Sequence, residues 1–378
     1  MSDSKDGRVL SPGKAAPGSH SLGEILSQPH CWSNCLKELG KPGLVDEICK
    51  PFGRATEWLF VGCGSSYYVA LAAAGAWSAI TGLRARAIPA SEILLFPDLV
   101  MAGAEKVAAV VISRSGRTSE AVQAAEVLEA RDVRTLAVTC TGDQPLQRVA
   151  TSTLCLLPAD EESTVMTRSF TSMLLALQYV ASCFAGDHAL TKNLRKLPGP
   201  AEKILKHITP ALSDFVNGRT FADYICLGQG PLYGLACETA LKITEMSVSY
   251  AQSFHTLEFR HGPKSVVSPD TLVIFLVSET GYDAECSVLE EIKSLGGTTL
   301  TVTNQGDHRA GSASDLLIEL NLEIPEIARF APYVFAGQLL GLYTGLKKGL
   351  DPDNPRHLDR VVMLDEEDTA EQSQHATI

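Results

Sequence analysis

Short apolar runs alternate along this chain with longer segments that carry apolar residues at helical spacing. The runs at 58–62, 107–112 and 135–139 are mainly apolar, and helix-like segments at 67–80 and 119–130 follow the first two of them. Continuous apolar runs of this length are typical of strands in a parallel sheet that is buried on both faces. The pattern therefore predicts an α/β protein with mainly parallel sheets flanked by helices.

The second half of the chain repeats the plan of the first half. Three motifs recur at offsets of 166, 165 and 164 residues: 62–67 matches 228–233, 111–116 matches 276–281, and 136–143 matches 300–307. A nearly constant offset at three strand ends indicates a duplicated domain. We expect a tail and lead-in helix over 1–44, a first domain over 45–197, a second over 211–350, and a C-terminal tail over 351–378 that closes the site.

Composition and charge exclude several classes of protein. The 378 residues are 45% hydrophobic and 20% charged, which suits a globular chain and argues against wholesale disorder. No run approaches the roughly 18 apolar residues of a membrane span, and the N-terminus lacks the apolar core of a secretory signal, so we expect a cytoplasmic protein. The net charge of −12 makes nucleic acid an improbable partner.

No metal or cofactor site is expected. The ten cysteines are spread singly, and no set of His, Cys and Asp has the spacing of metal ligands. Gly62-Cys-Gly64 follows a predicted strand, but Tyr67 stands where a dinucleotide-binding motif needs its third glycine. We therefore expect reduced cysteines and chemistry carried by side chains alone.

A cluster of hydroxyls and cations follows the strand at 107–112. Ser113, Arg114, Ser115 and Thr118 lie just before a predicted helix, whose N-terminal N–H groups and dipole favour an anion. Simple helix capping by a Ser or Thr is the alternative, although it needs fewer groups than are present. We interpret the cluster as a phosphate loop; the second copy has an acid where the first has Arg114.

The second half contributes the ionisable groups. Glu238, Lys242 and Glu245 are spaced so that they share one face of a predicted helix in an apolar setting. An exposed salt bridge would give the same spacing, but a buried row of this kind suits a ligand. His261 precedes a Gly-Pro turn, which places it on a loop. Carboxylates, a lysine, a histidine and a phosphate loop together suit proton transfer on a phosphorylated sugar.

Four motifs in this order, at 62–67, 113–118, 238–245 and 261–263, resemble the double sugar-isomerase (SIS) domain family from about residue 45 to 365. The resemblance extends to the isomerase half of glucosamine-6-phosphate synthase. The run at 259–265 looks closer to the branch of tagatose-6-phosphate ketose/aldose isomerase, or amino-sugar-phosphate deaminase/isomerase. The family resemblance implies two tandem SIS domains, each a flavodoxin-like three-layer sandwich.

The resemblance also implies roles for individual residues. It makes the substrate contacts Ser66, Ser113, Arg114, Ser115, Thr118, Thr167 and Arg360. Glu245 would move the proton between C1 and C2, with Lys242 and Glu238 beside it. His261 would assist ring opening in a neighbouring subunit's site, which implies a homodimer with shared active sites.

Three residues depart from the family pattern. Arg360 stands in place of a lysine that forms a Schiff base with a ketose, and an arginine cannot form one. Met166 replaces a sugar-contacting serine, although Thr167 remains, and Arg114 replaces a glutamine. The sequence also shows no glutaminase domain, so we do not expect this chain alone to make glucosamine 6-phosphate from glutamine.

We expect an aldose-ketose deaminase/isomerase that acts on a hexosamine 6-phosphate, with proton transfer between C1 and C2 and release of ammonia. One alternative is a ketose/aldose isomerase of an unaminated sugar such as tagatose 6-phosphate. The other is a non-catalytic sugar-phosphate sensor, which would not need the row formed by Glu238, Lys242 and Glu245.

Overall fold

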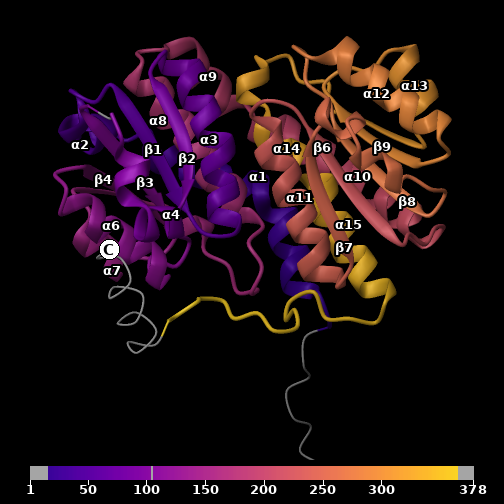
Figure 1. The fold of residues 1–378 in the computed structure, drawn as a ribbon, viewed down its shortest axis with the longest axis horizontal. Coiled ribbons are helices and arrows are strands. Elements are labelled where there is room, and N and C mark those ends of the chain that lie inside the picture. The colour runs from indigo at the N-terminus through magenta and orange to yellow at the C-terminus, as the bar shows by residue number, and fades with distance from the viewer. Residues whose placement is uncertain (1–15, 104, 365–378) are drawn as a thin grey trace, which may run out of the picture.

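Two parallel β-sheets form the framework of the chain (Figure 1). The structure is a computed structural model that describes residues 16–103 and 105–364. The first sheet contains β1 (Glu57–Gly62), β2 (Arg84–Pro89), β3 (Val107–Ile112), β4 (Arg134–Thr139) and β5 (Ser152–Cys155). The second contains β6 (Asp223–Gly228), β7 (Tyr250–His255), β8 (Thr271–Leu276), β9 (Thr298–Thr303) and β10 (Leu316–Glu319).

The two sheets have the same topology, which confirms the predicted tandem architecture. The strand orders are β2-β1-β3-β4-β5 and β7-β6-β8-β9-β10, and every pair is parallel. The central strands are buried almost throughout, as continuous apolar runs require in a sheet covered on both faces. Because carboxyl ends of parallel strands share one edge, each sheet gathers its strand-end loops on one side.

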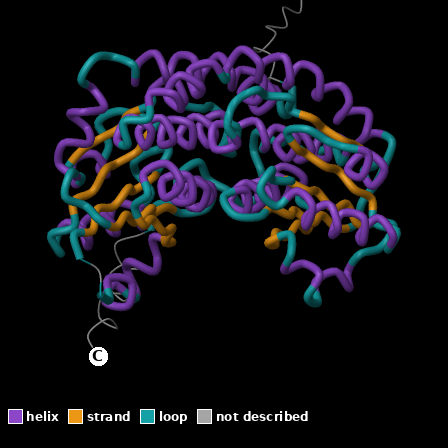
Figure 2. Tube along the Cα trace, turned by 90° about the horizontal axis from the view of Figure 1, so that it is seen from above, coloured by secondary structure: helices purple, strands orange, loops and turns teal. Residues whose placement is uncertain are grey.

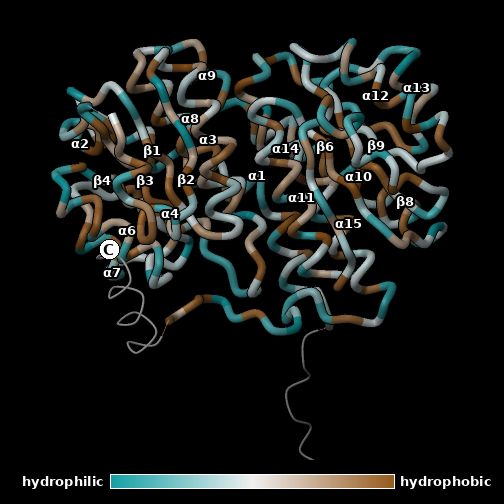
Figure 3. Tube along the Cα trace, in the orientation of Figure 1, coloured by the Kyte–Doolittle hydropathy of each residue, from teal (hydrophilic) through white to brown (hydrophobic). Residues whose placement is uncertain are grey.

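Helices cover both faces of each sheet. Those of the first half are α1 (Ser19–Leu39), α2 (Leu44–Cys49), α3 (Ser65–Thr81), α4 (Ala90–Leu95), α5 (Pro97–Met101), α6 (Ser119–Glu129), α7 (Pro145–Val149), α8 (Arg168–Phe184) and α9 (His188–Lys196). Those of the second are α10 (Pro198–Asn217), α11 (Leu232–Ser247), α12 (Tyr282–Ser294), α13 (His308–Ala313), α14 (Phe330–Tyr333) and α15 (Phe335–Lys347). Helices also fill the space between the two sheets (Figure 2), and apolar residues concentrate in the strands and these inner helices (Figure 3).

Local expectations hold for most elements and fail at one place. The residues between the two predicted domains, 198–210, belong to helix α10. Strand β2 was not predicted, because its alternating Arg and Ala residues at the edge of the sheet give no continuous apolar run. The predicted tail over residues 1–15 lies outside the described residues.

The segment after α15 joins the two domains. It runs beneath both, from α15 to the vicinity of α6 and α7 (Figure 1). Asp353 fixes its start by accepting hydrogen bonds from the backbone N–H and the hydroxyl of Ser21, both at 2.7 Å. Near its end, the backbone N–H of Ser119 donates to the carbonyl of Val362 at 3.3 Å. The segment therefore lies across the carboxyl edge of the first sheet.

Within the described ranges, no helix combines the length and apolar character that crossing a membrane requires.

Candidate active site

A cavity of about 190 Å³ lies where the carboxyl edge of the first sheet meets α11 and the C-terminal segment. Seven of the eleven predicted site residues line it: Ser66, Arg114, Ser115, Thr118, Lys242, Glu245 and Arg360. The other four, Ser113, Thr167, Glu238 and His261, do not. The two halves of the predicted chemistry, one from each domain, thus meet at a single cavity.

The loop between β3 and α6 is held in a tight turn that presents its hydroxyls. Gly116 has φ 63°, and a Cβ at this position would lie 2.8 Å from the Cβ of Gln144, so the turn requires glycine. Ser113 is buried, and its Oγ accepts the backbone N–H of Gly116 at 3.1 Å. Its hydroxyl therefore shapes the turn, whereas the side chains of Ser115 and Thr118 border the cavity at the start of α6.

Close packing of α3 against α11 brings the two domains' groups together. A Cβ on Gly234 of α11 would lie 2.7 Å from the backbone nitrogen of Ala72 on α3, so only glycine permits this approach. As a result Ser65 and Ser66, at the start of α3, share the cavity with Lys242 and Glu245 of α11.

The row on α11 forms a buried ion network. The Lys242 Nζ lies 3.5 Å from a carboxylate oxygen of Glu238 and donates a hydrogen bond to Glu245. The side chains of Glu238 and Lys242 are 0% and 1% exposed, whereas that of Glu245 is 17% exposed and borders the cavity. Of the two carboxylates, Glu245 is therefore the one placed to meet a ligand.

The protonation states of this row follow from burial and mutual attraction. Burial raises the pKa of Glu238 to about 8; Lys242 opposes this shift and Glu245 adds to it. Burial alone would lower the pKa of Lys242, but the carboxylates of Glu238 and Glu245 outweigh burial and raise it. The attraction to these carboxylates keeps Lys242 an ammonium group, which donates a hydrogen bond to Glu245.

Arg114 borders the cavity, but its guanidinium is already engaged by protein groups. It donates to the carbonyls of Thr164 at 2.9 Å, Val165 at 3.2 Å and Arg360 at 3.1 Å, and it lies 3.3 Å from Glu161. The side chains of Arg114 and Glu161 are 6% and 0% exposed. The guanidinium therefore ties two walls of the cavity together.

The C-terminal segment supplies one wall through Leu358, Asp359, Arg360 and Val362. The guanidinium of Arg360 pairs with Asp160 at 2.6 Å. Its backbone carbonyl accepts a hydrogen bond from Arg114, which belongs to the loop between β3 and α6 (residues 113–118, the serine loop). This position therefore closes the cavity with a paired cation.

Two predicted residues lie elsewhere. Thr167 is fully buried, and both its backbone N–H and its hydroxyl donate to Glu161, at 2.7 Å and 2.8 Å. His261 is exposed on the loop after the short 3₁₀ turn Glu258–Arg260 of the second domain, away from the cavity of its own chain. Thr167 therefore helps to hold Glu161, which pairs with Arg114 at the cavity wall. A role for His261 in a partner's site stays a prediction.

The matching loop of the second domain is filled by carboxylates. Glu279, at the position of Arg114, pairs with the buried Arg329 at 2.5 Å. The carboxylate of Glu326 accepts the backbone N–H of Glu279 at 2.6 Å and the hydroxyl of Thr280 at 3.3 Å. The Glu326 carboxylate therefore already occupies the hydrogen-bond donors of this loop. The matching loop of the first domain is the one suited to a bound phosphate.

Several site residues escaped the sequence analysis. Ser65, Thr164 and Asp359 line the cavity. Glu161, which anchors its wall, was also missed. Ser65 adjoins a motif that was noticed, but the others belong to irregular segments without periodicity or spacing, so no local signal marks them. In the described part of the chain, no three or more His, Cys, Asp and Glu side chains are grouped to hold a metal ion.

Comparison with known proteins identifies relatives of this arrangement. The SIS domain model matches residues 54–182 and 224–340. Glutamine–fructose-6-phosphate aminotransferase (isomerizing) of Methanothermobacter thermautotrophicus is 26% identical over 355 residues, 91% of this chain but 57% of that protein, so the chain spans little more than half of such relatives.

Solved structures give a similar result. Glucosamine-6-phosphate deaminase from Thermotoga maritima is 29% identical with a TM-score of 0.75, over 92% of this chain and all of that one. Tagatose-6-phosphate ketose/aldose isomerase from Escherichia coli has the same fold, with a TM-score of 0.82 and 21% identity, over 94% of this chain and 98% of that one.

Proposed function

The chain belongs to the SIS domain family, and from this premise we propose that it is a sugar-phosphate isomerase that acts on a hexosamine 6-phosphate and releases ammonia. The observation that carries the proposal is the meeting of the serine loop with the Lys242–Glu245 pair at one cavity. The cavity offers a phosphate-binding loop at one end and a proton-transfer group at the other, and these match the two ends of an open-chain sugar phosphate. The likeness to the Thermotoga deaminase supports the amino-sugar substrate.

The phosphate would bind at the start of α6. The hydroxyls of Ser115 and Thr118 border the cavity there. Thr118 is the N-cap residue of this eleven-residue helix, and the positive end of the helix dipole favours an anion there. Because the net charge of the chain is −12, this local concentration of donors must provide the attraction that the overall field does not.

Glu245 would transfer the proton between C2 and C1. Its carboxylate removes the C2 proton of the open-chain amino aldose, the electron pair moves into the carbonyl, and the carbonyl oxygen takes a proton from water to give an enolamine. Return of the carboxyl proton to C1 leaves a C2 iminium ion, which takes up water, returns a proton to the solvent and breaks down to the ketose and ammonia. The hydrogen bond from the Lys242 ammonium orients the carboxylate for both transfers.

Arg360 limits the routes open to the reaction. An arginine remains protonated at every accessible pH, so the position cannot form an imine with a ketose. Its pairing with Asp160 at 2.6 Å leaves it as part of the wall. Hydrolysis of the substrate's own C2 imine needs no lysine at this place, which is consistent with ammonia release.

Substitution of Glu245 tests this assignment. Glu245→Gln should reduce turnover by a factor of about 10²–10⁴, the usual contribution of a general base, while sugar-phosphate binding changes little. Glu47→Gln is the matched control, because Glu47 is an exposed carboxylate on α2. Loss of binding with normal turnover of the bound sugar would contradict the role of Glu245.

We also propose that two copies share their active sites through His261, which is exposed and does not line the cavity of its own chain. A mixture of inactive His261→Ala and Glu245→Gln chains tests this. If each site needs Glu245 from one copy and His261 from the other, random pairing restores about a quarter of the normal activity. No recovery after exchange of subunits would contradict shared sites.

A further inference from the structure

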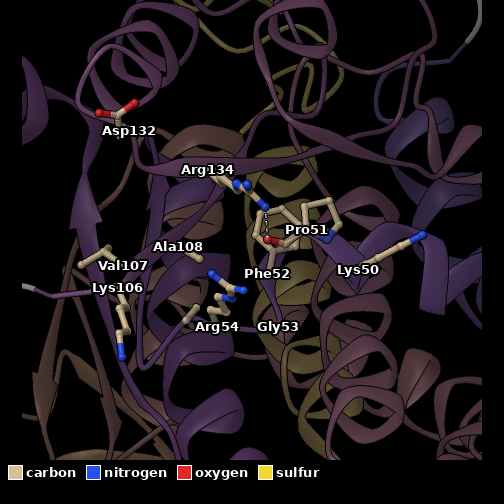
Figure 4. A pocket seen from close by; sticks show the side chains of 11 residues that line it. Lys50, Pro51, Phe52, Gly53, Arg54, Lys106, Val107, Ala108, Asp132 and Arg134 are labelled. Carbon is tan, nitrogen blue, oxygen red and sulfur yellow. Dashed lines mark hydrogen bonds between the residues drawn. The ribbon is translucent and has the colours of Figure 1, made fainter.

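A second and larger cavity, of about 530 Å³, lies in the first domain (Figure 4). It is formed by residues 50–55, just before β1, by residues 106–108 at the start of β3, and by Asp132 and Arg134 at the start of β4. These are the amino ends of strands whose carboxyl ends carry the candidate active site. Strands of six residues, at about 3.3 Å each, separate the two cavities by about 20 Å.

Four cationic side chains line this cavity against one carboxylate. Lys50, Arg54, Lys106 and Arg134 are exposed, and Asp132 is the acidic residue among the lining groups. Within residues 16–103 and 105–364, none of the four cations forms an ion pair. In a chain with a net charge of −12, four cations and one carboxylate along one cavity are a local excess of positive charge.

One of the four side chains is held by the backbone: Arg134 donates to the carbonyl of Pro51 at 2.7 Å. Figure 4 shows Arg54 and Arg134 between Lys50 and Lys106, whose ammonium groups point outward at the two ends of the view. Lys106 adopts φ 51°, and its carbonyl accepts the N–H of Thr56 at 3.0 Å. Left-handed backbone at a non-glycine residue is unfavourable and recurs at ligand clamps.

We propose that this cavity binds a metabolite that carries a diphosphate, such as a nucleoside diphosphate. Arginine forks and lysine ammonium groups are the side chains that recognise phosphates, and four of them exceed the need of one monophosphate. The buried Phe52 and Ala108 give the cavity an apolar floor for an organic group. Its volume falls within the range of small-molecule sites.

The side chains of this cavity are suited to binding a ligand and not to transforming it. The lining residues include no histidine, serine, threonine or cysteine, and Asp132 is their one carboxylate. Such a set can hold an anion, but it offers no nucleophile or paired acid and base for chemistry. This inference does not depend on which sugar phosphate the other cavity binds.

Calorimetric titration of the full chain with ADP and with inorganic pyrophosphate tests the proposal. We expect saturable binding at one site per chain that weakens as salt rises. Arg54→Ala/Lys106→Ala should weaken it at least about tenfold, because each lost charge-assisted contact is worth about that factor. Lys192→Ala/Lys203→Ala removes two exposed cations from other helices and should change affinity less than about twofold.

A further double variant separates this cavity from the serine loop. Ser115→Ala/Thr118→Ala should leave ADP binding intact, and circular dichroism must show that all variants are folded. The proposal is overturned if ADP and pyrophosphate do not bind, or if the Ser115→Ala/Thr118→Ala variant loses their binding. It is also overturned if Arg54→Ala/Lys106→Ala and Lys192→Ala/Lys203→Ala weaken binding equally. Binding of a long polyanion such as heparin without binding of ADP would also overturn it, since that indicates an extended surface.

Discussion

Replacement of Arg114 by methionine separates two possible roles of the serine loop's arginine. Sequence alone suggests a contact with substrate phosphate. In the structure the guanidinium instead donates to the carbonyls of Thr164, Val165 and Arg360 and lies 3.3 Å from Glu161. Methionine has a similar length but no charge, so Arg114→Met removes these contacts without opening a large cavity.

The loss of stability should be large because the ion pair is buried. The side chain of Glu161 is 0% exposed, and the substitution leaves it without its cationic partner. Breaking one member of a buried pair costs about 3–5 kcal/mol, and four carbonyls, including that of Ser163, also lose a donor. A loss of 3 kcal/mol corresponds to a more than 100-fold change in the ratio of folded to unfolded domain. The exposed Arg117, in the same loop, is the matched control as Arg117→Met.

Urea unfolding followed by tryptophan fluorescence measures this effect. Trp58 and Trp77 are buried in the first domain and report its unfolding. We expect the unfolding midpoint to fall markedly for Arg114→Met and little for Arg117→Met, with a raised KM for the sugar phosphate because two cavity walls loosen. If Arg114→Met is as stable as the control yet loses sugar-phosphate binding, the guanidinium acts on the phosphate and the structural reasoning is refuted.

Two further perturbations probe the buried row and the helix contact. Because burial raises the pKa of Glu238 to about 8 from 4.5, the folded chain holds a proton that the unfolded chain releases, and this stabilisation is lost as pH rises from about 4.5 to 8. Thermal melts at pH 5 and pH 8 should therefore show that the original chain loses stability relative to Glu238→Gln as the pH rises. An equal difference in melting temperature between the two chains at both pH values would disprove the raised pKa. Gly234→Ala should force α11 away from Ala72 on α3 and lower kcat. Gly23→Ala, whose Cβ meets nothing within 4 Å, should leave kcat unchanged, and equal kcat values for the two variants would show that the contact does not position the site.

The sheets were predictable because their strands are buried on both faces. Continuous apolar runs at 58–62 and 107–112 identify β1 and β3, and the repeat at a nearly constant offset predicts the second sheet. Strand β2 was missed because an edge strand with polar residues lacks that pattern.

The site was predictable where its residues lie at strand ends or on one helix face. The serine loop and the α11 row follow from such positions, since parallel strands gather their carboxyl ends and residues four apart share a helix face. The direction of a long side chain depends on distant segments: nothing near Arg114 in sequence shows that residues 161–165 and 360 will surround it. The same holds for Thr167, whose hydroxyl is taken by Glu161.

The most direct measurement of the proposed reaction follows ammonia and ketose together. Glucosamine 6-phosphate and galactosamine 6-phosphate are each incubated with the purified chain, and both products are quantified in the same samples. The account predicts equal amounts of ammonia and ketose from one of the two sugars, and formation of both products slowed by a factor of about 10²–10⁴ with Glu245→Gln. Conversion of an unaminated hexose 6-phosphate with no ammonia from either amino sugar would contradict deamination and establish a plain isomerase.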